Sequence, residues 1–383
     1  MVSLVRRGIA LRVVARRMRV SLDTVQRWVA RAAGQRLDRV DWRNRPPIAH
    51  TVQRTSRTTE NLILTLRREL KEQSALGEFG AVAIRRVLQA QTHAPIPTVR
   101  TIGRILVRRG AVDHRRRIRR PAPPPGWYLP AVAQGQAELD SFDIVEGLLL
   151  PDQRAIDVFT GISLHGGLIG AWPARAWTAR AVVATLVAHW RAVGLPAYAQ
   201  FDNDNRFQGP HQYADVIGRV MRLCLSLGVV PVFAPPREPG FQNAVEHLNG
   251  LWQAKVWGRF AHTTLEQVAA TSIRYVRAHR ARAATRTERA PRRAPFPRAW
   301  RLDLQAPLHG RVVFVRRTSE RGAVSLLGHT FLVDPQWCHR LVRCELLLNE
   351  HRIRFYALRR AQPEAHPFLR EALYRLPTRR FKE

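Results

Sequence analysis

The stretch Tyr198–Phe207 reads YAQFDNDNRF, and it decides the fold. Its first four residues predict a short strand that ends at Asp202. A run of polar residues follows the strand and predicts a turn. A carboxylate at a strand end is most often simply solvated, so the neighbouring segments must show whether Asp202 has a function.

Toward the C-terminus, the sequence predicts a helix over Gln212–Leu227 and a strand over Val229–Phe233. A last helix is predicted over Phe241–Trp257, after the loop that begins at Ala234. Glu246 lies within this helix. The apolar side of the helix is predicted to contain Val245, Leu248, Trp252 and Val256.

Toward the N-terminus, the sequence predicts three strands over residues 137–145, 154–160 and 162–172. A helix capped by Thr178 is predicted to run to Trp190. Short connections between the strands favour an antiparallel meander. The resulting order of elements, βββ-α-β-α-β-α, predicts a mixed sheet with helices on both faces.

This order is that of the ribonuclease H-like fold, and three motifs make the resemblance specific. Phe201–Phe207 (FDNDNRF) and Ala234–His247 (APPREPGFQNAVEH) resemble the second and third catalytic motifs of the retroviral-integrase superfamily. Glu138–Asp143 (ELDSFD) resembles the first motif. Over nearly its whole length the chain is similar to bacterial insertion-sequence transposases, which carry two N-terminal helix-turn-helix units and a small C-terminal β-barrel.

The resemblance implies that Asp140, Asp202 and Glu246 are both the catalytic residues and the metal ligands. Breaking or joining a phosphodiester is an in-line displacement that two Mg²⁺ or Mn²⁺ ions can assist. Magnesium prefers hard oxygen ligands, so a few carboxylates suffice to hold it. Asn203, Asn243 and Asn249 are expected to support the site by hydrogen bonding.

Two other carboxylates compete with Asp140 for the first position. Asp143 lies three residues further along the same strand, so in a regular strand the two side chains point to opposite faces and cannot both serve. Asp157 on the next strand is a second alternative. The chain also departs from the family pattern at Asp204, where glycine is usual, and in a longer spacing before Glu246. We expect the extra residues to lie between positions 208 and 218.

Composition favours a polyanionic partner. Lys+Arg is 63 against 29 for Asp+Glu, which gives a net charge of +34. The basic residues are concentrated in both ends of the chain, whereas the middle is close to neutral. No apolar run is long enough for a membrane span, and the three scattered cysteines and the histidines predict no zinc site. We expect a bacterial cytoplasmic protein associated with the nucleoid.

The N-terminal end is predicted to hold two helix-turn-helix units, at residues 1–36 and 59–112, joined by a linker at 37–58. A basic, proline-rich linker is predicted at 113–136. Candidate DNA contacts in the helical units and this linker have polar or basic side chains expected to face outward: Thr24, Gln26, Arg27, Arg31, Arg100, Arg104, Arg108, Arg115, Arg116 and Arg117. Arg237 and Lys255 are further candidates outside the helical units.

The remaining segments complete the predicted domain plan. The ribonuclease H-like core is expected over 137–277, and a basic linker over 278–308. Five short strands with tight turns predict a small closed barrel over 309–362, followed by a tail at 363–383. The protein is therefore expected to be multidomain, with an α N-terminal part, an α/β core and an all-β C-terminal part.

The sequence favours a metal-dependent transposase that cuts element ends and joins their 3′ hydroxyls to target DNA. Its partners would be double-stranded DNA, comprising the terminal repeats and the target, and further copies of itself. A DNA-binding regulator that has lost catalysis is the main alternative. A nuclease acting on RNA–DNA hybrids is less favoured, because paired helix-turn-helix units suit B-form duplex.

Overall fold

The computed structural model describes residues 1–43, 55–91, 95–112, 124–238 and 240–382. The candidate contacts Arg115, Arg116 and Arg117 lie outside these residues. The chain divides into two compact units, Met1–Arg57 and Thr58–Glu383. Among the described helices, none is long and apolar enough to cross a membrane.

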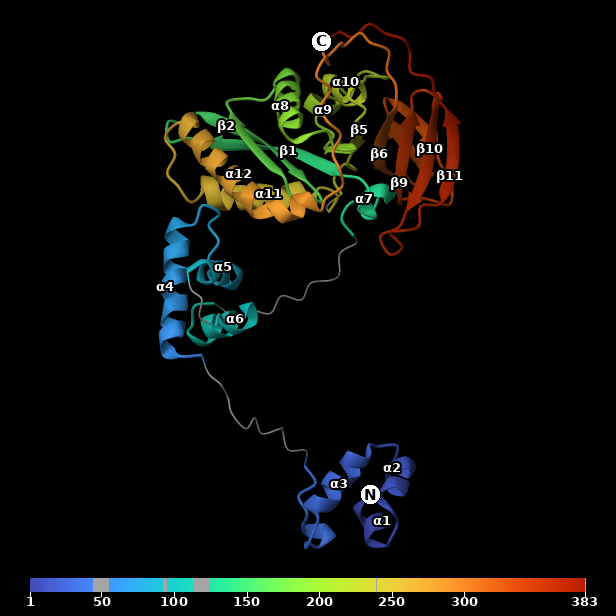
Figure 1. The fold of residues 1–383 in the computed structure, drawn as a ribbon. Helices are drawn as coiled ribbons and strands as arrows, with labels where there is room; N and C mark the ends of the chain where they lie inside the picture. The colour runs from blue at the N-terminus through green and yellow to red at the C-terminus, as the bar shows by residue number, and fades with distance from the viewer. Residues whose placement is uncertain (44–54, 92–94, 113–123, 239, 383) are drawn as a thin grey trace. The chain divides into compact units, whose positions relative to one another are not determined.

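The first unit consists of short helices packed on small apolar clusters (Figure 1). The break before its last α-helix is made by Arg19, whose φ of 52° ends α2 in the left-handed conformation. The Ser21 side chain then accepts a hydrogen bond from the Thr24 amide and so serves as the N-cap of the next helix. The elements are α1 (Val2–Arg6), α2 (Leu11–Met18), α3 (Leu22–Arg31) and a 3₁₀ turn at Leu37–Arg39.

The second unit begins with another group of three helices. Ile63, Ile84 and Ile102, one from each helix, are fully buried in its core. The Thr98 side chain caps the third helix by accepting from the Thr101 amide. The helices are α4 (Arg57–Gln73), α5 (Ala81–Gln91) and α6 (Val99–Arg108).

A nine-stranded mixed sheet forms the centre of the second unit, in the order β11-β10-β9-β6-β5-β4-β1-β2-β3. Strands β1, β4, β5 and β6 are parallel to one another, whereas β2 runs antiparallel to β1 and β3 runs antiparallel to β2, in a meander. The core strands are β1 (Leu139–Leu149), β2 (Ala155–Ser163), β3 (Ile169–Ala174), β4 (Tyr198–Phe201) and β5 (Val230–Phe233).

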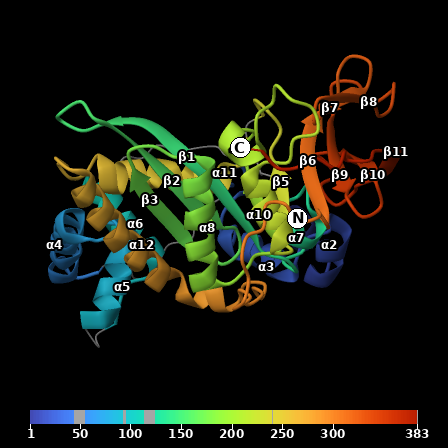
Figure 2. The same ribbon diagram turned by 90° about the horizontal axis from the view of Figure 1, so that it is seen from above.

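Helices cover both faces of this sheet, as the order of elements predicted. Helices α8 and α10 lie on one face, and α11 and α12 lie on the other (Figures 1 and 2). The helices of the core are α7 (Pro130–Ala133), α8 (Ala179–Val193), α9 (Asn205–Gln208), α10 (Arg219–Ser226), α11 (Asn243–Trp252) and α12 (Leu265–Glu288), with a π-helical turn at Gln253–Trp257 after α11.

Several predicted boundaries differ from the structure. The third predicted strand, 162–172, contains the end of β2, a turn and the first residues of β3, because Gly167 with φ of 67° reverses the chain there. The helix predicted over Gln212–Leu227 begins only at Arg219. The linker predicted from residue 278 is helical as far as Glu288, because α12 packs against the edge strand β3 and extends to that residue.

The C-terminal strands do not close into the predicted barrel. β6 (Arg311–Arg317) pairs with β5 and so continues the core sheet, and β11 pairs with β10 alone among the described strands. β11 also lies inside the predicted tail. The remaining elements are β7 (Ala323–Leu326), β8 (His329–Leu332), β9 (Leu341–Leu347), β10 (Arg352–Leu358) and β11 (Phe368–Leu373), of which β7 and β8 form a separate hairpin.

A row of phenylalanines crosses the sheet and fixes its register. The Phe142 ring lies 5.6 Å from Phe201, and the Phe233 ring lies 5.3 Å from Phe314. Phe201 is paired directly with Phe233. All four side chains are almost completely buried in the main core. Their close packing makes a one-residue slip of β1 against β4 costly, because it would move every side chain to the other face.

Candidate active site

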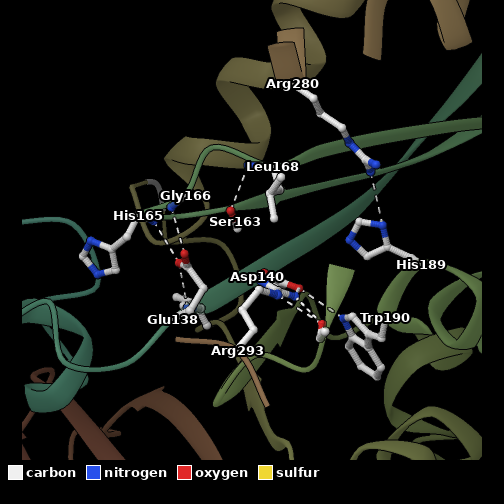
Figure 3. Close-up of polar contacts among 12 residues, drawn as sticks. Glu138, Asp140, Ser163, His165, Gly166, Leu168, His189, Trp190, Arg280 and Arg293 are labelled. Atoms are coloured by element: carbon white, nitrogen blue, oxygen red, sulfur yellow. Dashed lines mark hydrogen bonds and ion pairs between the residues drawn. The ribbon is translucent and has the colours of Figure 1, made fainter. Parts of the chain in front are cut away.

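The first predicted carboxylate, Asp140, is buried in the core away from Asp202. It is 1% exposed, and both of its oxygens accept hydrogen bonds from the Arg293 guanidinium at 2.8 and 2.6 Å (Figure 3). The Trp190 indole on α8 donates a further bond at 3.1 Å. Asp140 therefore faces α8 and is fully occupied as the partner of a buried arginine.

Asp143, on the same strand as Asp140, lies beside Asp202. It follows Phe142 on β1, and Asp202 follows Phe201 on β4. In the parallel pairing of β1 with β4, Asp140 lies opposite Ala199 and Ser141 lies opposite Gln200. Continuing this register by two residues places Phe142 beside Phe201, and Asp143 beside Asp202. Because successive side chains alternate, Asp143 faces α11, on the opposite side from Asp140.

A hydrogen-bond relay holds the Asp143 carboxylate. The Thr160 hydroxyl on β2 donates to the Asn249 side chain at 2.6 Å, and the Asn249 amide donates to Asp143 at 2.8 Å. The other carboxylate oxygen accepts from the Ile144 amide at 2.9 Å. Asn249 follows Glu246 by about one turn of α11, so the two side chains lie on the same face of the helix. The relay therefore ties the first carboxylate to the helix that carries Glu246.

The carboxylates influence one another. Burial raises the pKa of Asp143 to about 6, and the negative charges of Asp202 and Glu246 add to this rise against the hydrogen bonds from Ile144 and Asn249. Burial also raises the pKa of Asp202, against the hydrogen bond from the Asp204 amide, and the charge of Asp204 adds to the rise. Partly buried carboxylates that repel one another are stabilised by a bound cation.

The polar turn after Asp202 is ordered by its own side chains. Asp202 accepts from the Asp204 amide at 3.0 Å, and Asp204 caps α9 by accepting from the Arg206 amide at 2.7 Å. Asp204 has φ of −63°, so this turn has no need of glycine at that position. Arg206 also bonds Glu146 on β1 at 2.7 Å. The sequence departure at Asp204 is therefore compatible with an intact turn.

The other two supporting asparagines have different roles. Asn203 donates to the Ala234 carbonyl at 2.7 Å and accepts from Arg316 on β6 at 2.8 Å, so it joins the turn to two other strands. Asn243 is exposed at the start of α11. The sequence analysis did not identify two further supporting residues, Thr160 on β2 and Arg316 on β6. Their place beside the site depends on how the strands pair, which the local sequence does not show.

The donor set fits a divalent metal ion, although the side chains are not gathered into a finished site. Asp143, Asp202 and Glu246 offer only carboxylate oxygens, which suit Mg²⁺ or Mn²⁺. Glu246 is exposed on α11, and the described residues contain no group of three or more acidic, histidine or cysteine side chains close enough to hold an ion. Asp157 is directed elsewhere and accepts from the Gly147 amide.

The candidate DNA contacts fall into two groups. Gln26, Arg27, Arg100, Arg104 and Arg237 are exposed, and Thr24 is half-buried beside Ser21. By contrast, Arg31 pairs with Asp41, Arg108 pairs with the buried Glu60, and Lys255 donates to the Gly77 carbonyl at 2.8 Å. These three side chains make contacts within the protein, because long basic side chains can also satisfy local carbonyls and carboxylates.

Comparison with known proteins gives weak similarity to retroviral integrases. No protein-family model and no curated protein matches the chain. The HTLV-2 integrase catalytic core in complex with magnesium is 12% identical with a TM-score of 0.27, and the match covers 35% of this chain and 82% of that one. The catalytic core of BIV integrase is 19% identical with a TM-score of 0.27, and covers 36% and 80% respectively.

A third similar structure covers more of the chain. It is the simian T-cell lymphotropic virus intasome in complex with the PP2A regulatory subunit B56 gamma, at 13% identity and a TM-score of 0.32, covering 69% of this chain and 88% of that one. The structural neighbours are thus retroviral integrases. Values this low leave the function to be judged from the chain's own side chains.

Proposed function

We propose that the protein is a DNA transposase of the integrase type, which cleaves element ends and joins their 3′ hydroxyls to target DNA. The observation that carries the proposal is the pair of Phe-Asp steps on adjacent parallel strands, which brings Asp143 beside Asp202 and opposite the helix of Glu246. We therefore assign the first catalytic carboxylate to Asp143 in place of Asp140.

Asp143, Asp202 and Glu246 would hold one or two Mg²⁺ or Mn²⁺ ions. When bound, such ions activate the attacking oxygen and stabilise the leaving one. The protein's own part is positioning. The relay from Thr160 through Asn249 orients Asp143, the Asp204 amide orients Asp202, and rotation of the exposed Glu246 side chain would complete the set.

The basic ends of the chain would hold the DNA on which this site acts. Arginine grips phosphate through a planar fork, and the exposed Arg27, Arg100 and Arg104 lie on helices expected to enter a groove of the duplex. Phosphate contacts supply affinity, whereas contacts with base edges supply sequence preference. Double-stranded DNA and further copies of the chain are the proposed partners.

The test starts from duplexes selected by the wild-type protein out of a random pool. Those duplexes are end-labelled and incubated with Mg²⁺ or Mn²⁺, and strand cleavage and joining are followed on denaturing gels. We expect both products with the wild type and neither with Asp202→Asn, while duplex binding is retained by both. Tight duplex binding without cleavage by the wild type would instead favour a DNA-binding regulator that has lost catalysis.

A further inference from the structure

A large cavity lies beside the turn that carries Asp202. It has a volume of about 1070 Å³ and is bounded by three segments: the start of α8, the loop from Gly209 to Gly218 with the start of α10, and Arg379–Lys382 near the C-terminus. Asn205, the first residue of α9, contributes to its wall three positions after Asp202. The cavity is as large as those that hold small-molecule ligands in other proteins.

The loop that forms one wall is closed at its base. The Gly218 amide donates to the Gln208 carbonyl at 3.1 Å, and a side chain on Gly218 would meet that carbonyl oxygen at 2.6 Å. Within the loop, Pro210, Val216 and Ile217 give the cavity an apolar lining. Tyr213 also lines it, and it remains 60% exposed. An aromatic ring with this much exposure offers a face to a flat ligand.

The opposite wall is fixed by Phe381. Its amide donates to the Gln305 side chain at 3.0 Å, and its carbonyl accepts from the same side chain at 3.1 Å. The guanidinium groups of Arg219 and Arg222 lie 5.5 and 5.1 Å from the centre of its ring. The C-terminal segment is therefore held to Gln305 by hydrogen bonds and against α10 by cation–π contacts.

Positive charge dominates the rim of this cavity. Among the described residues that line it, the one carboxylate is that of Asp215, which accepts hydrogen bonds from Tyr374 and His329, each at 2.7 Å. Six cationic side chains line the same space: Arg180, Arg219, Arg222, Arg379, Arg380 and Lys382. An aromatic face, an apolar floor and a cationic rim together match the chemistry of a nucleotide, which combines a flat base with a phosphate.

We propose that this cavity binds one nucleotide unit, with its base against Tyr213 and its phosphate among the arginines of the rim. Two sources offer that chemistry: an unpaired nucleotide of a DNA strand held at Asp202, or a free mononucleotide. The strand source rests on the proposed function, because it needs DNA at the carboxylates. Binding itself needs no catalysis, and so it can be tested separately.

The experiment measures binding to the full-length protein in EDTA, where no cleavage can occur. One arm follows the fluorescence of 2-aminopurine in an eight-nucleotide single strand, and the other titrates thymidine and adenosine monophosphates by calorimetry. Tyr213→Ala is compared with Tyr213→Phe, which keeps the ring. Thermal melting of each variant checks that the fold is retained.

We expect Tyr213→Ala to weaken binding of the single strand about tenfold or more, and Tyr213→Phe to bind as the wild type does. Loss confined to the single strand would assign the site to a DNA strand, whereas equal loss for the monophosphates would assign it to a free nucleotide. If Tyr213→Ala binds both probes as the wild type does, the proposal is overturned. Absence of cleavage in the assay above would overturn the proposed function but leave this result unchanged.

Discussion

At the scale of single residues, Asp140 and Asp143 differ in what surrounds them. Asp140 neutralises the buried Arg293, whereas Asp143 is repelled by the carboxylates near it. The same type of residue is therefore stabilising in one place and destabilising in the other. Substitution by asparagine removes the charge at nearly constant volume, so it separates these roles.

We predict that Asp140→Asn lowers the free energy of unfolding by about 3–5 kcal/mol, because the Arg293 charge would be left buried without its partner. Urea unfolding of the metal-free protein measures this change. Asp152→Asn is a suitable control, since Asp152 is a surface carboxylate paired with nearby Arg154. Unchanged stability in Asp140→Asn would show that the ion pair with Arg293 is absent in solution.

We predict the opposite change in the free energy of unfolding for Asp143→Asn. A pKa of about 6 means that the folded state disfavours the ionised carboxylate, so at neutral pH this charge reduces stability. Removing it should raise the free energy of unfolding of the metal-free protein, by up to about 3 kcal/mol at 1.36 kcal/mol per pKa unit. Differential scanning calorimetry in EDTA at pH 7.5 would record a higher Tm. A lower Tm would contradict the crowding of carboxylates.

His189 gives a prediction for pH. It packs edge-on against Trp172 at 5.2 Å, and burial lowers its pKa to about 4, with the nearby Arg280 and Arg293 acting in the same direction against Asp140. The unfolded chain binds this proton more readily than the folded one between about pH 6.5 and 4. Stability should therefore fall as the pH falls through that range, by up to about 3 kcal/mol.

His189→Gln should remove that part of the pH dependence. Denaturant unfolding of the wild type and the variant between pH 7 and 4.5 measures it. The variant is expected to show a flatter slope, whatever its absolute stability. Equal slopes would mean that His189 is solvated or protonated in the folded protein.

At the scale of helices and strands, the α4–α6 helices are attached to the core through basic side chains that include Arg259 and Lys255. Arg259 donates to the carbonyls of Lys71, Glu72 and Ser74 at the end of α4. Lys255 donates to the Gly77 carbonyl and lies 5.3 Å from the centre of the Phe79 ring. Both extend from the π-helical turn and loop that follow α11, the helix of Glu246.

We predict that Arg259→Ala loosens this attachment. The last carbonyls of α4 would lose a charged donor, so amides at the end of α4 and in residues 74–80 should exchange hydrogen faster by about tenfold. Hydrogen exchange followed by mass spectrometry measures the change, and the exposed Arg277 on α12 provides a control as Arg277→Ala. Unchanged protection of α4 would show that the contact is dispensable.

Elements with a strong local pattern could be predicted from the sequence. β4 was predicted over its observed range, and Thr178 caps α8. Val245, Leu248 and Trp252 on α11 are buried as expected, as is Val256 in the π-helical turn after it. The sequence did not decide whether Asp140 or Asp143 faces α11, because the alternation of side chains defines two faces of β1 without showing which of them α11 covers. The repeated Phe-Asp step in β1 and β4 is the signal that distinguishes them.

At the scale of the whole molecule, the C-terminal strands show the limit of local reasoning. Alternating runs correctly indicated strands, but pairing of β6 with β5 is a long-range contact that no local pattern specifies. A closed barrel would leave no unpaired strand edge. Here β6 instead pairs with the edge of the core sheet, which buries Val313 and Phe314. The same pairing brings Arg316 to Asn203, next to the candidate site.

The net charge of +34 leads to a prediction for DNA binding. Each phosphate contact releases counterions, so the logarithm of the affinity for duplex should fall steeply with the logarithm of salt concentration. Deleting residues 1–57, one compact unit, should reduce this slope by several units. Fluorescence anisotropy over a salt series measures it. An unchanged slope would exclude the first unit from DNA binding.

The most direct test of the central claim is binding of Mn²⁺ without DNA, followed by electron paramagnetic resonance at pH 7.5 for the wild type, Asp143→Asn and Asp140→Asn. If Asp143 completes the site with Asp202 and Glu246, Asp143→Asn should weaken Mn²⁺ binding about tenfold or more, while folded Asp140→Asn binds nearly as the wild type does. Loss of binding in Asp140→Asn alone, with Asp143→Asn unaffected, would contradict the assignment and restore Asp140 to the site.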